Sequence, residues 1–337
     1  MKNKKNRISL AWVAYQRRAE SLARYYDLDL YYQHYKWEEK SKYYKPVAYI
    51  FKLIQTFSTL FKTRAKIIFL QQPPTFPLYA VAFYCWLTKA IYVADCHNTT
   101  FYDSTWSKFP FLKSLLRKAM TVLVHNEDIA DKVKDWGMPI LLLRDPIPQI
   151  NADENITNIG GIDIKKDRYV IIPGSFATDE PMDEVFKAIR SLPDVIFACT
   201  WFKERLPGEL QKEVPKNLRL TGFLEEREFN ALYANASAAI VLTNREGTQP
   251  SGAAEAISLN VPLVVSDIAT TRKLYSQAAI FVRSEGDSIA QGVQQALHDQ
   301  AGIRLRLKDL KEKLSSGNNQ QLLLLKEQLD RYSKANS

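Results

Sequence analysis

Short apolar runs alternate with amphipathic segments along the chain, and this alternation constrains the fold more than any other feature. Residues 239–267 show it most clearly, because they read as strand, polar loop, helix and strand: AIVLTNREGTQPSGAAEAISLNVPLVVSD. Both predicted strands, residues 239–242 and 263–265, are apolar throughout. Strands without a polar face are typical of parallel sheets that are covered on both sides, so we expect an α/β fold.

The helix predicted after residue 250 begins with small residues, Ser251, Gly252 and Ala253. The first N–H groups of a helix have no partner within the helix and carry the positive end of its dipole. Small side chains would let a phosphate or diphosphate approach those groups. Glu255, one turn further on, is able to accept hydrogen bonds from two neighbouring hydroxyls, such as those of a ribose. The same residues are equally consistent with ordinary helix packing.

The alternation of strands and helices runs through both halves of the chain. Predicted strands occupy residues 8–13, 28–32, 67–70, 91–94, 121–124 and 140–143, and then residues 169–172, 195–199, 218–220, 239–242, 263–265 and 279–282. We therefore predict two doubly wound, Rossmann-like domains facing across a cleft. The predicted parts are an N-terminal domain (1–148), a linker rich in Pro, Gly, Asn and Asp (149–168), a C-terminal domain (169–315) and a terminal helix that packs back on the body (316–337).

The net charge of the chain is concentrated in its N-terminal half. Residues 1–150 contain 23 Lys and Arg against 12 Asp and Glu, a net charge of +11. The rest of the chain contains 23 and 25, a net charge of −2. Such asymmetry favours an anionic partner for the first half, such as a membrane with anionic lipids or a phosphate-bearing acceptor. No recognised nucleic-acid motif is present, so we do not expect a nucleic-acid partner.

Two apolar segments in this basic half bear on membrane association. Residues 43–61 are aromatic and basic, which fits either a helix lying on a membrane interface or an ordinary helix covering the sheet. Residues 76–88 are too few to span a bilayer, and we expect them to form a buried helix. The three cysteines are widely spaced, without metal or disulfide spacing, which fits a reduced cytoplasm.

The second half of the chain resembles the GT-B glycosyltransferases, and glycosyltransferase family four (glycosyl transferases group 1) in particular. Three features carry the resemblance: Gly222-Phe223-Leu224 followed by a helix and a strand, the stretch EGTQPSGAAEA that ends in Glu255-Ala256, and the strand VPLVVSD. They cover roughly residues 168–300. Over residues 1–150 the resemblance rests on the order of the predicted elements alone.

The resemblance implies a site for a nucleotide-sugar. Glu255 would bind the ribose, the N–H groups of residues 251–253 would hold the diphosphate, and Phe223 and Leu224 would flank the base. Enzymes of this kind often place a histidine after a strand of the N-terminal domain, near the transferred sugar. His97 in Ala-Asp-Cys-His-Asn is the matching position, although a structural histidine at a strand end would look the same.

The chain departs from the family pattern at the first of two acids that the family places about seven residues apart. Eight residues separate Glu246 from Glu255. The first acid, which lies near the sugar hydroxyls, is therefore either Glu246 shifted by one place or is replaced by the backbone of Gly247 and Thr248.

Two further departures concern basic residues. The glycine-rich turn after the first strand is replaced by Tyr15-Gln16-Arg17-Arg18, so Arg17 or Arg18 would face the diphosphate or an anionic acceptor. A solvated helix start is equally consistent with these two arginines. The Arg–Lys pair that usually follows the first C-terminal strand is absent, and Lys203 or Arg205 would have to supply that charge.

The resemblance implies transfer of a sugar to a lipid-linked or polysaccharide acceptor in cell-surface glycan synthesis, at the cytoplasmic face of a membrane. We expect no cofactor and no metal, since helix N–H groups and a cation can stabilise the leaving diphosphate. A retaining reaction, as in family four, needs no dedicated base, whereas an inverting one would use Asp95 or Asp103 as general base. The alternative is a non-catalytic GT-B protein acting as a scaffold or partner subunit.

Overall fold

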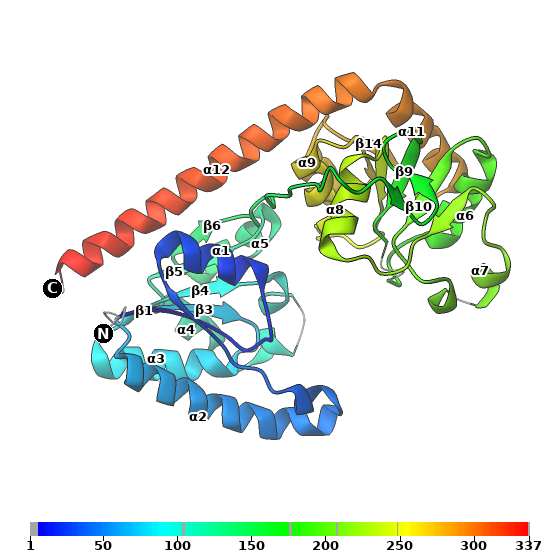
Figure 1. The fold of residues 1–337 in the computed structure, drawn as a ribbon. Coiled ribbons are helices and arrows are strands. Elements are labelled where there is room, and N and C mark those ends of the chain that lie inside the picture. Colours follow the sequence, from blue (N-terminus) through cyan, green and yellow to red (C-terminus); the bar gives the residue numbers. More distant parts are fainter. Residues whose placement is uncertain (1–5, 103–104, 175–176, 207, 248, 336–337) are drawn as a thin grey trace. The chain divides into compact units, whose positions relative to one another are not determined.

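A computed structural model describes residues 6–102, 105–174, 177–206, 208–247 and 249–335. The chain divides into two compact units (Figure 1). Unit 1 comprises Met1–Pro146 and Gly317–Ser337, and unit 2 comprises Ile147–Ser316. Each unit contains one six-stranded sheet with parallel strand pairs and with helices packed on it. The predicted α/β fold class, with two doubly wound sheets, is therefore confirmed.

The sheet of unit 1 has the strand order β2-β1-β3-β4-β5-β6. Its strands are β1 (Arg7–Ala11), β2 (Asp29–Tyr32), β3 (Ile67–Gln72), β4 (Ile91–Cys96), β5 (Thr121–Val124) and β6 (Ile140–Leu142). The order reverses between β1 and β3, which is where ligands bind in open α/β sheets, outside the carboxyl ends of the strands. Alternate residues of β3 point to opposite faces, because Ile68 and Leu70 join one hydrophobic core and Ile67 and Phe69 join the other.

The two faces of this sheet are covered by different helices. Helix α1 (Arg17–Tyr26) and the part of α12 (Gln300–Ala335) that follows residue 316 share one core, to which Leu22, Tyr26, Leu325 and Leu329 belong. Residues of α2 (Lys45–Thr63), α3 (Phe76–Thr88), α4 (Leu112–Arg117) and α5 (Glu127–Val133) belong to the core on the other face. Six short 3₁₀ helices are described: Lys36–Glu39, Lys42–Tyr44, Asn98–Thr100, Trp106–Lys108, Lys134–Trp136 and Lys203–Arg205.

The sheet of unit 2 has the strand order β11-β10-β9-β12-β13-β14. Its strands are β9 (Tyr169–Ile172), β10 (Ile196–Cys199), β11 (Leu218–Leu220), β12 (Ala238–Val241), β13 (Leu263–Ser266) and β14 (Ile280–Val282). Its helices are α6 (Met182–Ser191), α7 (Gly208–Lys212), α8 (Glu226–Ala234), α9 (Ser251–Leu259), α10 (Ala269–Tyr275) and α11 (Gly286–His298). Here the order reverses between β9 and β12, so this unit places its reversal between its first and fourth strands.

The segment predicted as a linker packs on unit 2. It contains a small antiparallel hairpin of β7 (Asn158–Ile159) and β8 (Ile162–Asp163). Ile159, Ile162 and Ile164 are buried in the core of unit 2. These isoleucines of the segment therefore contribute to the core of unit 2. The domain boundaries given above stay a prediction.

One sequence expectation fails on α3. The helix forms where it was predicted, but it is not buried throughout, because Phe83, Trp86 and Leu87 are more than half exposed. Apolar composition alone could not tell which residues of this helix face the sheet. Within the described ranges, none of the helices combines the length and apolarity that crossing a bilayer requires.

Candidate functional site

Polar side chains gather at the carboxyl ends of the strands in unit 1, around the point where the strand order reverses. Gln16 and Arg18 follow β1, His97 follows β4 and His125 follows β5. Gln71 and Asp95 are the second-last residues of β3 and β4. Hydrogen bonds and ion pairs connect all six. The sequence analysis named three of them as candidates for the site: Arg18, Asp95 and His97.

Arg18 and Asp95 form a buried ion pair beneath this cluster. Arg18 Nε donates to both carboxylate oxygens of Asp95, at 2.9 and 3.1 Å, and the two side chains are 3% and 5% exposed. Arg18 also donates to Asp145 Oδ1 at 3.0 Å and to the Leu143 carbonyl at 2.9 Å. These bonds commit the guanidinium to the interior, so the prediction of a phosphate or acceptor contact passes to the exposed Arg17.

The pKa values of the pair follow from these contacts. Burial alone would raise the pKa of Asp95, but Arg18 and then His125 lower it well below its ordinary value. Burial would lower the pKa of Arg18, yet the carboxylates of Asp95 and Asp145 raise it. A carboxylate held ionised in this way is a weak proton acceptor. The predicted role of Asp95 as a general base is therefore poorly supported, and a positioning role suits its contacts better.

His97 is held in one ring orientation by two amides. The side-chain amide nitrogens of Gln16 and Gln71 both donate to His97 Nε2, at 3.1 and 3.2 Å. Because Nε2 accepts, the neutral ring carries its proton on Nδ1. Burial and the neighbouring His125 lower the pKa of His97 to about 4. At neutral pH this side chain is therefore an uncharged hydrogen-bonding group, which suits contact with a sugar hydroxyl better than proton abstraction.

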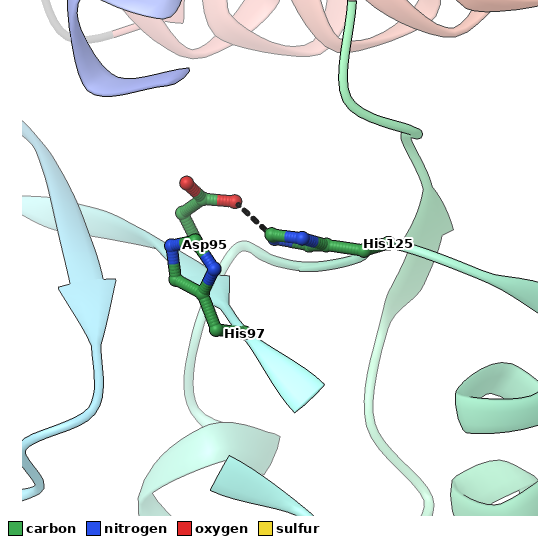
Figure 2. Close-up of side chains that lie close together, drawn as sticks. All are labelled: Asp95, His97 and His125. Carbon is green, nitrogen blue, oxygen red and sulfur yellow. Dashed lines mark ion pairs between the residues drawn. The ribbon is translucent and has the colours of Figure 1, made fainter. Parts of the chain in front are cut away.

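His125 completes the cluster and raises the question of a metal. Its Nε2 lies 3.5 Å from Asp95 Oδ1, and its ring centre lies 4.4 Å from that of His97 (Figure 2). Asp95, His97 and His125 each offer a ligand atom within 4.8 Å of the others. However, the Arg18 guanidinium contacts the same carboxylate, and its positive charge opposes a divalent cation there. We therefore assign no metal to this cluster.

An Asp-x-Asp triplet, the spacing of many metal-binding transferases, does occur in the chain at Asp27-Leu28-Asp29. The structure places it away from the cluster. Asp27 caps the C-terminus of α1 and Asp29 opens β2, so the triplet lies at the amino-terminal end of the sheet. Because ligands bind at the carboxyl ends of such strands, its position gives no support to a metal-dependent transferase.

Unit 2 contains a cavity of about 350 Å³ at the reversal between β9 and β12. It lies between the turn that follows β9 and the loop that joins β12 to α9, and Gly174, Thr243, Gln249, Ser251 and Gly252 are among the residues that line it. The position is the one that the strand order predicts for a ligand. The volume is in the range of small-molecule sites.

Close packing at Gly252 shapes this cavity. A Cβ atom at Gly252 would lie 2.8 Å from Pro173 Cγ, which is too close for a side chain. Tyr233 Oη donates to the Gly252 carbonyl at 2.8 Å from the buried side of the helix. The first turn of α9 therefore lies against the end of β9. Ser251 and Gly252 line the cavity, whereas Ala253 does not line it and donates its N–H to the Pro250 carbonyl. The predicted contact of these N–H groups with a diphosphate stays a prediction.

The charges that line the cavity are negative. Asp179 and Glu180, in the turn after β9, are the only charged residues among its described lining residues. Asp179 Oδ2 accepts a hydrogen bond from Thr243 Oγ1 at 2.5 Å. Lys203 and Arg205, which were expected to supply positive charge, lie in the 3₁₀ helix after β10 and do not line the cavity. A cation for a leaving diphosphate is therefore missing from the described lining.

The remaining predicted donor residues lie outside this cavity. Glu255 is half-buried on α9. Burial of Tyr233 raises the pKa of its hydroxyl, and the negative charge of Glu255 raises it further. Phe223 is 83% exposed at the end of β11, and Leu224 packs on the core of unit 2. Their predicted contacts with ribose and base stay predictions. Thr248 lies outside the described residues, as does Asp103.

Glu246 has a structural role. Its carboxylate accepts hydrogen bonds from the N–H groups of Ala269 and Thr270, at 3.0 and 3.1 Å, and from Thr270 Oγ1 at 2.7 Å. These bonds, that from the Thr270 hydroxyl above all, lower the pKa of Glu246. It thereby caps the first turn of α10, where a negative charge is favourable. Its predicted catalytic role would require the carboxylate to exchange these partners.

Comparison with solved structures identifies the class of fold. Three of the similar structures are HepE from Anabaena in complex with UDP and glucose (12% identity, 94% of this chain, 91% of that chain, TM-score 0.61), sucrose-phosphate synthase from Thermosynechococcus elongatus (14%, 86%, 79%, 0.59) and a putative UDP-N-acetylglucosamine 2-epimerase from Listeria monocytogenes (10%, 96%, 96%, 0.64). The chain therefore has the GT-B fold, as the sequence predicted. A search of curated protein sequences finds no match.

The family follows from the sequence of unit 2. The family model described as glycosyl transferases group 1 matches residues 161–321, which is nearly the whole of that unit. Over these residues the chain thus carries a glycosyl transferases group 1 domain. This confirms the resemblance inferred from Glu255-Ala256 and the strand that ends at Asp267.

Several residues of the candidate sites escaped sequence reasoning. The sequence analysis assigns a role to the arginines next to Gln16 but none to Gln16 itself, and it does not name Gln71. Asp179 and Glu180 stand where a basic pair was sought. All four follow a predicted strand next to a reversal of strand order. Strand order was the signal that would have found them, and it is not visible in one sequence.

Proposed function

We propose that this glycosyltransferase moves a sugar from a nucleotide-sugar to a lipid-linked or polysaccharide acceptor in cell-surface glycan synthesis, with retention and without a metal. The observation that carries the proposal is the cavity at the reversal between β9 and β12, closed on one side by the first turn of α9. It lies within the residues that match the group 1 family. HepE, which shares the fold, has been solved in complex with UDP and glucose, and this supports a donor of the same kind.

The proposed roles divide between the two units. The N–H groups at the start of α9, near Ser251 and Gly252, hold the diphosphate, because they carry the positive end of the helix dipole. Glu255 binds the ribose, and Phe223 contacts the base. In unit 1, the neutral His97 donates from Nδ1 to a sugar hydroxyl. Retention suits this assignment, because neither His97 nor Asp95 has a pKa suited to a general base.

The carboxylates of Asp179 and Glu180 in the cavity weigh against tight binding of a diphosphate. Lys203 and Arg205 remain the proposed source of a compensating charge, since their 3₁₀ helix follows the neighbouring strand β10. Asp179 and Glu180 also favour the alternative, a non-catalytic GT-B protein that acts as a scaffold or partner subunit. The experiment below distinguishes the two.

The test is a thermal-shift screen of the full chain with UDP-, GDP- and ADP-sugars. Binding at a hundredfold excess over Kd should raise Tm by about 5 °C for one base. Glu255→Ala should abolish that rise, whereas Glu226→Ala, at an exposed acid that opens α8, should leave it unchanged. Donor hydrolysis or transfer, measured as release of the nucleoside diphosphate, then shows the activity. A chain that binds none of these sugars would be a scaffold and not a transferase.

A further inference from the structure

Helix α2 turns its apolar side chains outward. Val47, Ile50, Phe51, Ile54 and Phe61 are between 47% and 61% exposed. Their spacing puts them on one side of the helix. A helix on a globular protein normally turns such a stripe toward the core, so the reversed orientation of α2 needs a cause.

Hydrogen bonds on the inward face of α2 supply that cause. Lys52 is 2% exposed, and its Nζ donates to Glu38 Oε1 at 2.7 Å. Thr56 is fully buried, donates to Gln33 Oε1 at 2.7 Å and accepts from Trp12 Nε1 at 3.1 Å. Rotating the helix to bury its apolar stripe would break these three bonds. The outward direction of the apolar residues is therefore fixed by the fold.

Helix α3 extends the apolar surface. Phe83, Trp86 and Leu87 are 52%, 69% and 54% exposed, and the Phe83 ring lies 6.2 Å from that of Phe57 on α2. The two helices lie side by side on one face of the sheet (Figure 1). We call the exposed side chains on these two helices the apolar face: Val47, Ile50, Phe51, Ile54, Phe61, Phe83, Trp86 and Leu87.

The chain around the apolar face is purely basic. From Lys40 to Ala94 it contains eight Lys and Arg and no Asp or Glu. All of these bases except Lys52 are exposed. Uninterrupted positive charge next to exposed aromatic and aliphatic side chains is typical of a surface that lies in the interface of an anionic membrane.

A basic cavity of about 430 Å³ adjoins the apolar face at the C-terminal ends of α2 and α3. Arg64, Lys66 and Lys89 line it together with Phe61, which also belongs to the apolar face. Tyr332 closes one side, and its hydroxyl donates to the Lys89 carbonyl at 2.7 Å. Three basic residues around a cavity of this size suit a phosphate group, and Phe61 belongs to both the cavity and the apolar face.

We propose that the apolar face docks on a bilayer that contains anionic phospholipid, and that this cavity takes the phosphate of a lipid headgroup. A second copy of the chain is a poorer occupant, because a two-fold interface would bring two equally basic surfaces together. A protein partner is disfavoured as well, since lysine is depleted in protein interfaces. Docking on a membrane would bring the enzyme to a lipid-linked acceptor, and this biological purpose rests on the proposed function.

The experiment is flotation of the full chain with phosphatidylcholine vesicles, with and without about 30% phosphatidylglycerol. The wild type should float with the anionic vesicles, and less so at 0.5 M NaCl. Ile54→Glu should lower partitioning about tenfold or more, because it places a charge in the apolar face. The matched control is Leu305→Glu, at a side chain of equal exposure on unit 2 (63% against 61%), and it should float like the wild type.

A second pair of variants tests the cavity. Arg64→Gln combined with Lys89→Gln removes two of its cations and should lower binding to anionic vesicles by about tenfold or more. Lys118→Gln combined with Lys134→Gln removes two exposed bases elsewhere in unit 1 and should cost at least threefold less. Inorganic phosphate at 10 mM should not displace the wild type from vesicles. Displacement would show a site for free phosphate in place of a lipid headgroup.

Three results would overturn docking of the apolar face on a bilayer: no flotation of the wild type, equal flotation of Ile54→Glu, or a dimer in sedimentation that Ile54→Glu dissociates. The last would assign the apolar face to a second copy. Circular dichroism of each variant separates loss of binding from loss of fold. No donor is present in these measurements, so a chain that floats but binds no nucleotide-sugar refutes the proposed function and leaves the docking surface standing.

Discussion

Replacement of Arg18 by methionine should destabilise unit 1 strongly. Methionine keeps the length of the side chain but removes the cation, and it leaves the Asp95 carboxylate 5% exposed without the two hydrogen bonds at 2.9 and 3.1 Å. Breaking a buried ion pair by removing one partner typically costs about 3–5 kcal/mol. With a slope of about 2 kcal/mol per molar urea, the unfolding midpoint should fall by about 2 M.

Tryptophan fluorescence is a suitable assay, because five of the six tryptophans lie in unit 1 and only Trp201 lies in unit 2. Arg17→Met is the matched control. It removes a neighbouring cation that is exposed, so its effect should stay within about 0.5 kcal/mol. The double variant Arg18→Met with Asp95→Asn should recover part of the loss, because no unpaired charge then remains buried.

The dependence on pH has a definite sign. The pKa of Asp95 is lowered in the folded wild type, so the pair's stabilisation is complete above the unfolded pKa of about 3.9 and is lost as the pH falls below it. In Arg18→Met, burial without a partner raises that pKa. The difference in unfolding free energy between wild type and variant should therefore shrink between pH 7 and pH 4. A cost below 1 kcal/mol at pH 7, or a difference that grows toward pH 4, would refute the reasoning.

Three further predictions concern the candidate sites. Gly252→Ala should cost about 1–3 kcal/mol in urea unfolding and weaken nucleotide-sugar binding, because the new Cβ would meet Pro173. Gly208→Ala is the control, because a Cβ added there meets nothing within 4 Å. An unchanged Kd for Gly252→Ala would contradict the proposed diphosphate site. In nitrogen NMR the His97 ring should be neutral at pH 6, with its proton on Nδ1, and should titrate near pH 4. Because the pKa of His97 is lowered in the folded state, the free energy of unfolding should fall as the pH drops from about 6.5 to 4. Protonation of the ring above pH 6 would contradict this. Glu246→Gln should cost about 1 kcal/mol by weakening the cap of α10, and loss of transfer at unchanged stability would instead support a catalytic role.

The sequence predicted the strands well, because most of them are short apolar runs of the kind that a covered parallel sheet buries. It could not predict the orientation of α2. Val47, Ile50 and Ile54 look like the inward stripe of an ordinary helix, and only the buried partners of Lys52 and Thr56 turn them outward. Hydrogen bonds between residues far apart in sequence carry no local pattern.

The same limit applies to the candidate sites. The small residues Ser251 and Gly252 indicated a helix start that another group can approach closely, and both residues line the cavity of unit 2. The role of Arg18 was not predictable, because its partners come from β4 and from beyond β6, 77 and 127 positions away. Glu246 was judged by its spacing from Glu255, whereas its partners lie on α10.

The discontinuity of unit 1 has a consequence for biosynthesis. Leu325 and Leu329 complete the core that contains Leu22 and Tyr26, and Tyr26 Oη donates to the Leu322 carbonyl at 2.9 Å. The ribosome synthesises all of Ile147–Ser316 before it reaches these leucines. During translation the part of this face that Leu325 and Leu329 cover, next to α1, therefore stays exposed while the second unit is synthesised. A nascent chain arrested at residue 316 should bind chaperones through that face. The end of α12 therefore completes the core of unit 1 last, although most of unit 1 is synthesised first.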